Sequence, residues 1–428
     1  MSNRPTVVDL FSGAGGMSLG FEQAGFDVVA AVEIDPIHAA AHEFNFPKCK
    51  TLCKSVTEVT GESLRALPTL GGNAPDVVIG GAPCQGFSLI GQRALDDPRN
   101  SLVRDFVRIV RDSGASYFVF ENVKGLTVGK HRKFLDEIVG EFSKAGFNVR
   151  LPWKVLNAKN HGVPQDRQRL ILLGAKKGLT LPDYPALQNG NPTCEDALSD
   201  VPDAELFHEL EDSDEVATWK WGEPSAYGRE MRCLGNDAWH FGHVRKWSPE
   251  FLTSSARTSH TKISRRRFAD TPEGTVEPIS RFYKLSRSGV SNTLRAGTDA
   301  SRGAFTSPRP IHFEHNRCVT VREMARLHGF PDWFRFHVTK WHGARQIGNA
   351  VPPPLARAVA AQLIEAMSIS PAAPAEPLAL GDPRLLRMGM AEAAEHFGIQ
   401  VPIGRRDRKS GAKKRKQAEI EAELRAAE

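Results

Sequence analysis

A cysteine in a segment rich in glycine and proline is the first candidate for chemistry. Cys84 lies in residues 80–88 (GGAPCQGFS), directly after an apolar run. Most free cysteines are small, buried hydrophobic residues. Glycine and proline on both sides of Cys84 nevertheless favour a stiff, exposed turn, and an exposed cysteine that loses its proton is a strong nucleophile. Cys84 is therefore a candidate nucleophile.

Charged side chains adjoin two further apolar runs. Glu121 ends one such run in the sequence ENV, although a glutamate at this position could equally cap a helix or pair with a base. Arg167 and Arg169, in the sequence QDRQR, stand two positions apart before another run, so in a strand both would project from one face. Paired guanidinium groups suit anionic or carbonyl oxygens, although an exposed edge would carry them as well.

A glycine turn near the N-terminus is a candidate ligand site. Residues 9–16 (DLFSGAGG) lead from an apolar run into a helix-like segment, so backbone N–H groups could approach a ligand closely. The dinucleotide fingerprint would need a glycine where Ser18 stands, which argues against a nicotinamide oxidoreductase. Glu33, about 20 residues further on, could accept the hydroxyls of a ribose. A nucleoside ligand without pyrophosphate, most commonly S-adenosylmethionine, and a tight turn without any ligand both stay open.

These residues need a scaffold that brings them together. Short apolar runs alternate with amphipathic stretches over residues 5–175, which predicts an α/β fold with a mostly parallel sheet. Because the carboxyl ends of parallel strands share one edge, residues 11–16, Glu33, Cys84 and Glu121 should converge there. The predicted strands are residues 6–10, 28–33, 76–80, 117–121 and 170–173; helices are predicted at residues 17–24, 321–328 and 354–367, and a linker at residues 370–377.

Length and composition exclude several classes of protein. The 428 residues suggest two to three domains, and 40% hydrophobic with 25% charged residues is ordinary globular composition, not collagen-like, disordered or membrane-embedded. Six scattered cysteines argue against a disulfide scaffold and for a reducing cytoplasm, and no metal site is predicted. No leader pattern and no apolar run of membrane-spanning length occurs.

The charge is unevenly distributed along the chain. Residues 405–416 hold eight basic side chains and one acid, so this tail alone accounts for the positive balance of +6. Residues 240–302 hold twelve basic side chains and five acids, after an acidic stretch over residues 195–237. A basic face of this kind suits a phosphate backbone, and a solvated loop region without a ligand is an equal alternative.

Six segments, in this order and spacing, resemble the DNA (cytosine-5) methyltransferase family of bacterial restriction–modification systems. The resemblance covers roughly residues 6–175 and 317–366. It implies a Rossmann-like S-adenosylmethionine-dependent methyltransferase domain with a second, smaller and irregular target-recognition domain. The segments are DLFSGAGG (9–16), PCQGFS (83–88), ENV (121–123), QDRQR (165–169), REMARLHGFP (322–331) and QIGNAVPP (346–353).

The resemblance implies a catalytic role for four residues. Cys84 would add to carbon 6 of a flipped cytosine in double-stranded DNA, which activates carbon 5 for methylation. Glu121 would act on ring nitrogen 3 of the base. Arg167 would contact the base carbonyl, and Arg169 would support the active-site loop.

The resemblance also implies the cofactor contacts. Many relatives carry an aspartate for the adenine amino group where this chain has Ser55, a weaker acceptor. The residues expected to bind S-adenosylmethionine are Phe11, Gly13, Gly15, Gly16, Glu33, Ile34, Asn349 and Val351.

The same resemblance divides the chain and suggests partners. We expect a catalytic domain in residues 1–180 and 316–367, a target-recognition domain in residues 181–315, and a linker with a basic tail in residues 368–428. A bacterial cytoplasmic monomer that modifies double-stranded DNA, with a restriction endonuclease acting separately, is the expected setting. The RNA-modifying branch of the same fold and a binding protein without turnover are the alternatives. The complete set of catalytic side chains argues against the latter.

Overall fold

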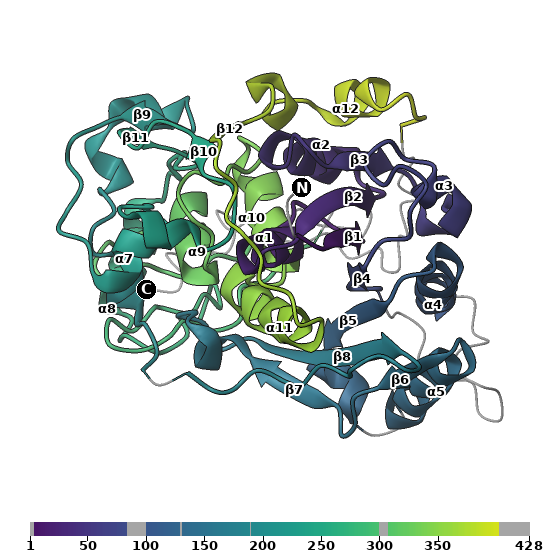
Figure 1. Ribbon diagram of the computed structural model, residues 1–428. Coiled ribbons are helices and arrows are strands. Elements are labelled where there is room, and N and C mark those ends of the chain that lie inside the picture. Colours follow the sequence, from purple (N-terminus) through teal and green to yellow (C-terminus); the bar gives the residue numbers. More distant parts are fainter. Residues whose placement is uncertain (1–3, 84–99, 129–130, 189, 299–306, 402–428) are drawn as a thin grey trace, which may run out of the picture.

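The fold centres on one eight-stranded sheet covered by helices on both faces (Figure 1). This computed structural model describes residues 4–83, 100–128, 131–188, 190–298 and 307–401. In the described parts of the chain, every helix is too short or too polar to traverse a lipid bilayer.

The sheet has the strand order β3-β2-β1-β4-β5-β8-β6, and β7 also pairs with β8. The five strands from β3 to β5 are parallel, whereas β8 runs antiparallel to β5, β6 and β7. The strands are β1 (Thr6–Leu10), β2 (Asp27–Glu33), β3 (Lys50–Cys53), β4 (Val77–Gly80), β5 (Tyr117–Val123), β6 (Phe147–Val149), β7 (Lys154–Asn157) and β8 (Gln168–Lys176).

The predicted Rossmann-like α/β fold is confirmed, with two differences in the sheet. Strands β3, β6 and β7 were not predicted, and the predicted strand over residues 170–173 is part of the antiparallel β8. The strand order reverses at β1, because β2 and β3 lie on one side of it and β4 and β5 on the other. Open α/β sheets bind their ligands at such a switch point.

Helices pack on both faces of the sheet, so alternating residues of a strand are buried under different helices. Neighbouring residues such as Val7 and Val8 belong to different hydrophobic clusters, because successive strand side chains point to opposite faces. One cluster includes side chains of α1, α9 and α11, and the other includes α4 and α5. The helices of this part are α1 (Gly16–Ala24), α2 (Pro36–Asn45), α3 (Gly61–Arg65), α4 (Ser101–Ser113), α5 (His131–Lys144), α9 (Val321–His328), α10 (Lys340–Asn349) and α11 (Pro353–Ala366).

Sequence signals at helix ends explain two of the boundaries. Helix α2 begins after Asp35, whose carboxylate accepts the backbone N–H of Ile37 and His38. Helix α9 begins with a capping box between Thr320 and Glu323 and covers the residues predicted for it. These caps fix where α2 and α9 start relative to the sheet.

The second region, residues 190–318, has little regular structure. Its helices and strands are short: α6 (Cys194–Leu198), α7 (Ala226–Met231), α8 (Lys262–Asp270), β9 (Val216–Ala217), β10 (Arg245–Lys246) and β11 (Phe251–Leu252). Buried arginines tie it to the rest of the molecule. Arg326 on α9 binds Asp200 and Asp332, and Arg245 on β10 binds both carboxylate oxygens of Glu22 on α1.

The expected linker and tail include an ordered stretch that the sequence analysis did not predict. Strand β12 (Leu378–Ala379) pairs with β10, and the 3-10 helix at Pro383–Leu386 and helix α12 (Met390–His396) lie beside α2. Leu385 and Leu386 are buried against Ala40, Ala41 and Phe44 of α2. Apolar residues spaced for this contact stand among many charges, which hid the signal.

Candidate active site

A cavity of about 400 Å³ lies at the carboxyl ends of β1, β2, β4 and β5. This volume falls within the range of small-molecule sites, about 300–1,000 Å³. Glu121 also lines the cavity. Seven of the eight residues expected to bind the cofactor line it: Phe11, Gly13, Gly16, Glu33, Ile34, Asn349 and Val351.

The glycine turn and Glu33 form one wall of this cavity. The backbone N–H of Gly13 donates to Oε2 of Glu33 at 2.8 Å, and the N–H of Asp35 donates to Oε1 at 2.9 Å. These two bonds fix the carboxylate and leave each oxygen able to accept a second hydrogen bond. Burial raises the pKa of Glu33, so a ligand that donates hydrogen bonds to it would stabilise its charged form.

Gly15 and Gly16 act differently from one another. Gly15 precedes α1 with a φ of 103° and does not line the cavity, because its α-carbon faces the ring of Phe46. Gly16 lines the cavity, and a β-carbon there would lie 2.5 Å from the carbonyl oxygen of Val351. The missing side chain at Gly16 therefore lets Val351 approach closely enough to close the cavity.

Asp9 is a cavity residue that sequence reasoning missed. Its carboxylate accepts a hydrogen bond from Ser18 at 2.6 Å, and Ser18 in turn lies 3.0 Å from Nε2 of His42. Burial raises the pKa of Asp9 from 3.8 to about 7 and lowers the pKa of His42 to about 3. The signal was available, because Asp9 is a charged residue inside a predicted buried strand.

Residues 345–351, at the end of α10 and just after it, contribute the opposite wall of the cavity. Arg345 and Asn349 stand four positions apart on α10 and both line the cavity, as expected for one face of a helix. Asn349 and Val351 were predicted here from the resemblance, whereas Arg345 was not. Its position one turn before Asn349 could have identified it.

Glu121 and Arg169 form an ion pair at the rim of the cavity. Nε of Arg169 lies 2.7 Å from Oε1 of Glu121, because antiparallel pairing of β5 and β8 sets Arg169 opposite Val123. A β-carbon at Gly81 would lie 2.5 Å from Oε2 of Glu121, so this glycine makes room for the carboxylate. Burial raises the pKa of Glu121, against the opposing effects of Arg169 and Arg167.

Arg167 does not share the environment of Arg169. It precedes β8, is 1% exposed, and its guanidinium donates to the backbone carbonyls of Leu294, Gly348 and Ala350 at 2.8–3.0 Å. These bonds engage both terminal nitrogens, whereas the buried Nε has no hydrogen-bond partner in the described ranges. Because the guanidinium is buried and held by three backbone carbonyls, the geometry does not favour Arg167 as the group that contacts a base. The expectation that both arginines project from one strand face is wrong, because the strand begins after Arg167.

Cys84 lies outside the described residues, which include the segment that leads to it. Pro83, to which Cys84 is bonded, lines the same cavity as Glu121. Nδ2 of Asn122 donates to the carbonyl oxygen of Ala82 at 2.9 Å. This bond holds the segment that precedes Cys84 against the end of β5.

Ser55 does not line the cavity. Its hydroxyl lies 2.7 Å from that of Thr57 and accepts the backbone N–H of Thr57, which caps a 3-10 helix. The structure therefore gives Ser55 a local role, whereas Asp35 does line the cavity.

Comparisons with known proteins agree with this geometry. A parallel sheet with a glycine turn, a carboxylate after the second strand and a charged pair at the rim defines the class of Rossmann-like methyltransferases. The model of the C-5 cytosine-specific DNA methylase family matches residues 5–365, and the chain belongs to this family. It is a DNA (cytosine-5) methyltransferase of the type II restriction–modification kind.

Individual relatives extend over nearly the whole chain. The chain is 58% identical over 406 residues to the type II methyltransferase M.XorII of Xanthomonas oryzae pv. oryzae, covering 95% of each protein. It is 34% identical to the type II methyltransferase M1.HphI of Haemophilus parahaemolyticus, over 84% of this chain and 87% of that protein.

Solved structures show the same fold. A protein described as a DNA modification methyltransferase encoded within a prophage of E. coli superposes with a TM-score of 0.70 at 32% identity, over 85% of this chain and 99% of that one. The Dnmt2 methyltransferase of S. pombe, at 18% identity and a TM-score of 0.50, shares the fold.

Proposed function

We propose that the chain transfers a methyl group from S-adenosylmethionine to carbon 5 of a cytosine flipped out of double-stranded DNA, through a covalent bond to Cys84. The observation that carries this proposal is the Glu121–Arg169 pair at 2.7 Å, on the rim of the cavity that Pro83 also lines. Catalysis at one base needs the acid, the nucleophile and the methyl donor within reach of each other.

The lining of the cavity fits the cofactor. Four carboxyl groups line it, and those that are ionised suit a molecule that carries a sulfonium and an ammonium charge. The hydroxyl oxygen of Ser12, another lining residue, is buried and has no hydrogen-bond partner within the described ranges. When bound, S-adenosylmethionine supplies an electrophilic methyl group. Its ribose would be held by Glu33 and its adenine by Ile34, while Phe11, Gly13, Asn349 and Val351 would contact the remainder.

Carbon 5 of cytosine is a weak nucleophile. Cys84 and Glu121 would make it more nucleophilic. The Cys84 thiolate adds to carbon 6, and the electron pair of the 5,6 double bond becomes available at carbon 5. Glu121 holds a proton at ring nitrogen 3, so no full negative charge develops on the ring. Burial, which raises the pKa of Glu121, favours the protonated carboxyl group that this step needs. After methylation, loss of the carbon 5 proton expels the thiolate and restores the aromatic ring.

Arg169 and Arg167 would have different roles in the reaction. We assign Arg169 to the base carbonyl, because its side chain already lies beside the Glu121 carboxylate at the rim. Arg167 is a positioning residue. It holds the carbonyls on both sides of Asn349, together with Leu294 from the irregular region, and so would connect the base site with the cofactor site.

Residues 181–315 are proposed as the target-recognition region, between the two parts of the catalytic domain. Arg295 supports this assignment, because it is exposed and has no partner in the chain segments that the structure covers. The backbone beside it is fixed, since Leu294 accepts from Arg167 and donates to Gln165. An exposed cation on a fixed backbone is suited to a DNA phosphate. A separate cognate endonuclease and a monomeric state are part of the same proposal.

The proposal is tested by replacing Cys84 with serine. Bisulfite sequencing of DNA from cells that express the native protein should reveal protected cytosines at one recognition sequence, and the Cys84→Ser protein should protect none. Binding of S-adenosylmethionine, measured by calorimetry, should persist, because the thiolate serves only the covalent step. Cys233→Ser, at a half-buried cysteine outside the cavity, is the matched control and should methylate normally. Unchanged methylation by Cys84→Ser would exclude the covalent mechanism.

A further inference from the structure

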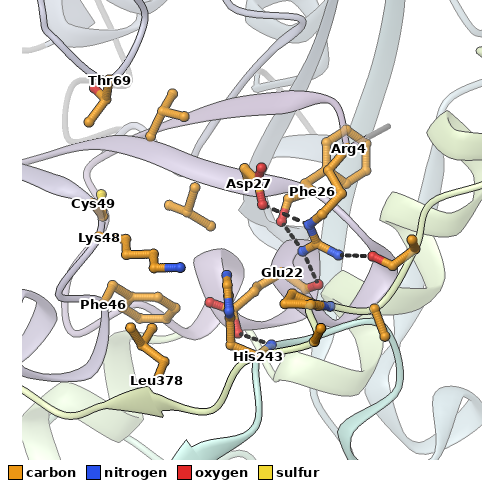
Figure 2. Close-up of a pocket in the computed structure, with 16 residues that line it drawn as sticks. Arg4, Glu22, Phe26, Asp27, Phe46, Lys48, Cys49, Thr69, His243 and Leu378 are labelled. Carbon is orange, nitrogen blue, oxygen red and sulfur yellow. Dashed lines mark hydrogen bonds and ion pairs between the residues drawn. The ribbon is translucent and has the colours of Figure 1, made fainter. Parts of the chain in front are cut away.

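A second cavity, of about 450 Å³, lies at the opposite end of β2 from the cofactor cavity (Figure 2). Asp27 and Val28, which begin β2, line the second cavity, whereas Glu33, which ends β2, lines the first. The two cavities share no lining residue. The further cavity is therefore independent of the methyl-transfer site, and nothing in the proposed reaction uses it.

Most charges around this second cavity are neutralised within the protein. Arg4 donates through Nε to Asp27 and through its terminal nitrogens to four backbone carbonyls, so its five N–H groups are all used. One of these carbonyls belongs to Ala372, which also lines the cavity. Glu22 is likewise occupied, because it binds Arg245 through both oxygens. These bonds build the walls, use every N–H group of Arg4 and neutralise the charge of Glu22.

Two nitrogen-bearing side chains that line the second cavity differ from Arg4 in their hydrogen bonding. Lys48 and the His243 ring have no hydrogen-bond partner among the residues that the structure describes, and Nδ1 of His243 is buried. Figure 2 shows the Lys48 ammonium group pointing into the cavity on the side of the His243 ring. Burial lowers the pKa of His243, with a further contribution from Lys48. The buried Nδ1 of His243 has no partner and needs an explanation, and an anion bound between the His243 ring and the exposed Lys48 ammonium group would supply one.

The remaining walls are apolar. Apolar side chains line them: Phe26, Val28, Val29, Phe46, Leu378, Ala372, Ala373 and Ala375. Lys48 and Thr69 are exposed, so the cavity can be reached from solvent. Its volume falls within the usual range for sites that take molecules of drug or metabolite size.

We propose that this cavity binds a small molecule that joins a carboxylate or phosphate to an apolar, ring-sized body. Lys48 and His243 hold the anionic group, and Phe46, Leu378 and the β2 valines pack on the body. Lys48 belongs to the sheet region and His243 to the irregular region, so the bound molecule spans the two. Binding therefore strengthens the junction between them.

Phenyl phosphate is a suitable probe, because it carries both parts of this chemistry on a small scale. Calorimetry on the full chain, with S-adenosylmethionine present to occupy the first cavity, should show saturable binding. Inorganic phosphate and phenol, each with only one part, should bind at least about tenfold more weakly. Benzoate distinguishes whether the site prefers a carboxylate or a phosphate, and either preference agrees with the proposal.

Three variants separate this site from general surface binding. Lys48→Met and His243→Phe should each weaken phenyl phosphate binding about tenfold or more, since each removes a hydrogen bond to a charged group. Lys50→Met is the matched control, because Lys50 is an equally exposed lysine two residues away that does not line the cavity. Thermal unfolding verifies that the variants remain folded.

The following results would overturn the proposal. One is the absence of saturable binding of both phenyl phosphate and benzoate at millimolar concentration. A second is equal binding by Lys48→Met, His243→Phe and the native protein. A third is binding that S-adenosylmethionine displaces, which would locate the probe in the first cavity. None of these outcomes bears on methyl transfer, so the proposed function is tested separately.

Discussion

The sheet region and the irregular region position their side chains by different means. In the sheet, strand register suffices: pairing between β5 and β8 brings Arg169 to Glu121, and β1 and β2 end together at the glycine turn and Glu33. In residues 190–318, two-residue strands are all the sheet that the described chain forms, and buried arginines position the side chains instead. Arg326 of α9, which is fully buried, joins Asp200 near the start of this region to Asp332, which follows α9.

This difference has an energetic consequence. Backbone hydrogen bonds tolerate most side-chain changes, whereas a buried ion pair fails when one partner is removed. The irregular region should therefore be sensitive at a few arginines and tolerant between them. Such tolerance suits the target-recognition role that we propose for this region.

The largest effect is expected where a buried arginine is removed. Arg326→Met leaves Asp200 and Asp332 buried without their main partner and should lower the free energy of unfolding by about 3–5 kcal/mol. Arg266→Met, at an 86% exposed arginine that lies 3.9 Å from Asp270, should change it by less than about 1 kcal/mol. Urea unfolding of both variants measures this contrast. Equal losses would mean that burial of the pair does not distinguish the two sites.

Arg167 tests whether an arginine at the junction of the two regions acts by position. Arg167→Lys cannot reach three carbonyls at once and should reduce kcat/KM by about 100-fold, with higher KM for both DNA and S-adenosylmethionine. Arg169→Lys should mainly lower kcat, because we assign its side chain, which pairs with Glu121, to the base carbonyl. Steady-state kinetics with each substrate varied separately makes the comparison. A change confined to kcat in Arg167→Lys would contradict the positioning role.

Asp9 tests the sheet region through pH. Folding raises the pKa of Asp9 from 3.8 to about 7, so the folded chain holds this proton more tightly than the unfolded chain. The free energy of unfolding therefore falls as the pH rises between these two values, by at most about 4 kcal/mol from this group. Asp9→Asn should lose this part of the pH dependence and gain stability relative to the native protein at pH 8.

Urea unfolding without cofactor at pH 5 and pH 8 measures the Asp9 effect. Asp270→Asn is the matched control, because Asp270 is exposed and should leave the pH profile unchanged. An Asp9→Asn protein with the native pH profile would show that Asp9 ionises normally in the folded state.

The smallest effect is expected at the surface of the irregular region. Arg295→Ala should raise the Kd for target DNA several-fold and reduce the slope of log K against log salt by about one unit. The recognised sequence should stay the same, because a phosphate contact carries no sequence information. Binding measured at several salt concentrations tests this, with Lys144→Ala, at an exposed lysine on α5 outside the irregular region, as the control. A changed recognition sequence would make Arg295 a base-reading residue.

Much of the fold could be predicted from the sequence because the sheet strands carry strong local signals. Five apolar runs became β1, β2, β4, β5 and β8, and the predicted helix at residues 321–328 is α9. The direction of β8 could not be predicted, because period-2 patterns are the same for parallel and antiparallel strands. The packing of residues 378–397 on α2 was missed because it depends on a distant partner.

Some residues of the candidate site could likewise be predicted from the sequence, whereas the environments of others could not. Phe11, Gly13, Asn349 and Val351, which line the cavity, could be expected there because they belong to short segments with a fixed order. Glu33, which also lines it, could be expected because it ends a predicted strand about 20 residues after the glycine turn. The different environments of Arg167 and Arg169 depend on where β8 begins and on carbonyls more than 100 residues away. The spacing of the two arginines contains no information about either.

Helix α11 packs against α1 and follows the last wall of the cofactor cavity, so the site joins the first and last parts of the catalytic fold. A ribosome that has made only the first half of the chain has made Glu121 without Asn349 and Val351, which line the same cavity. We therefore expect that a nascent chain cannot close this cavity until nearly the whole sheet region and α11 have emerged.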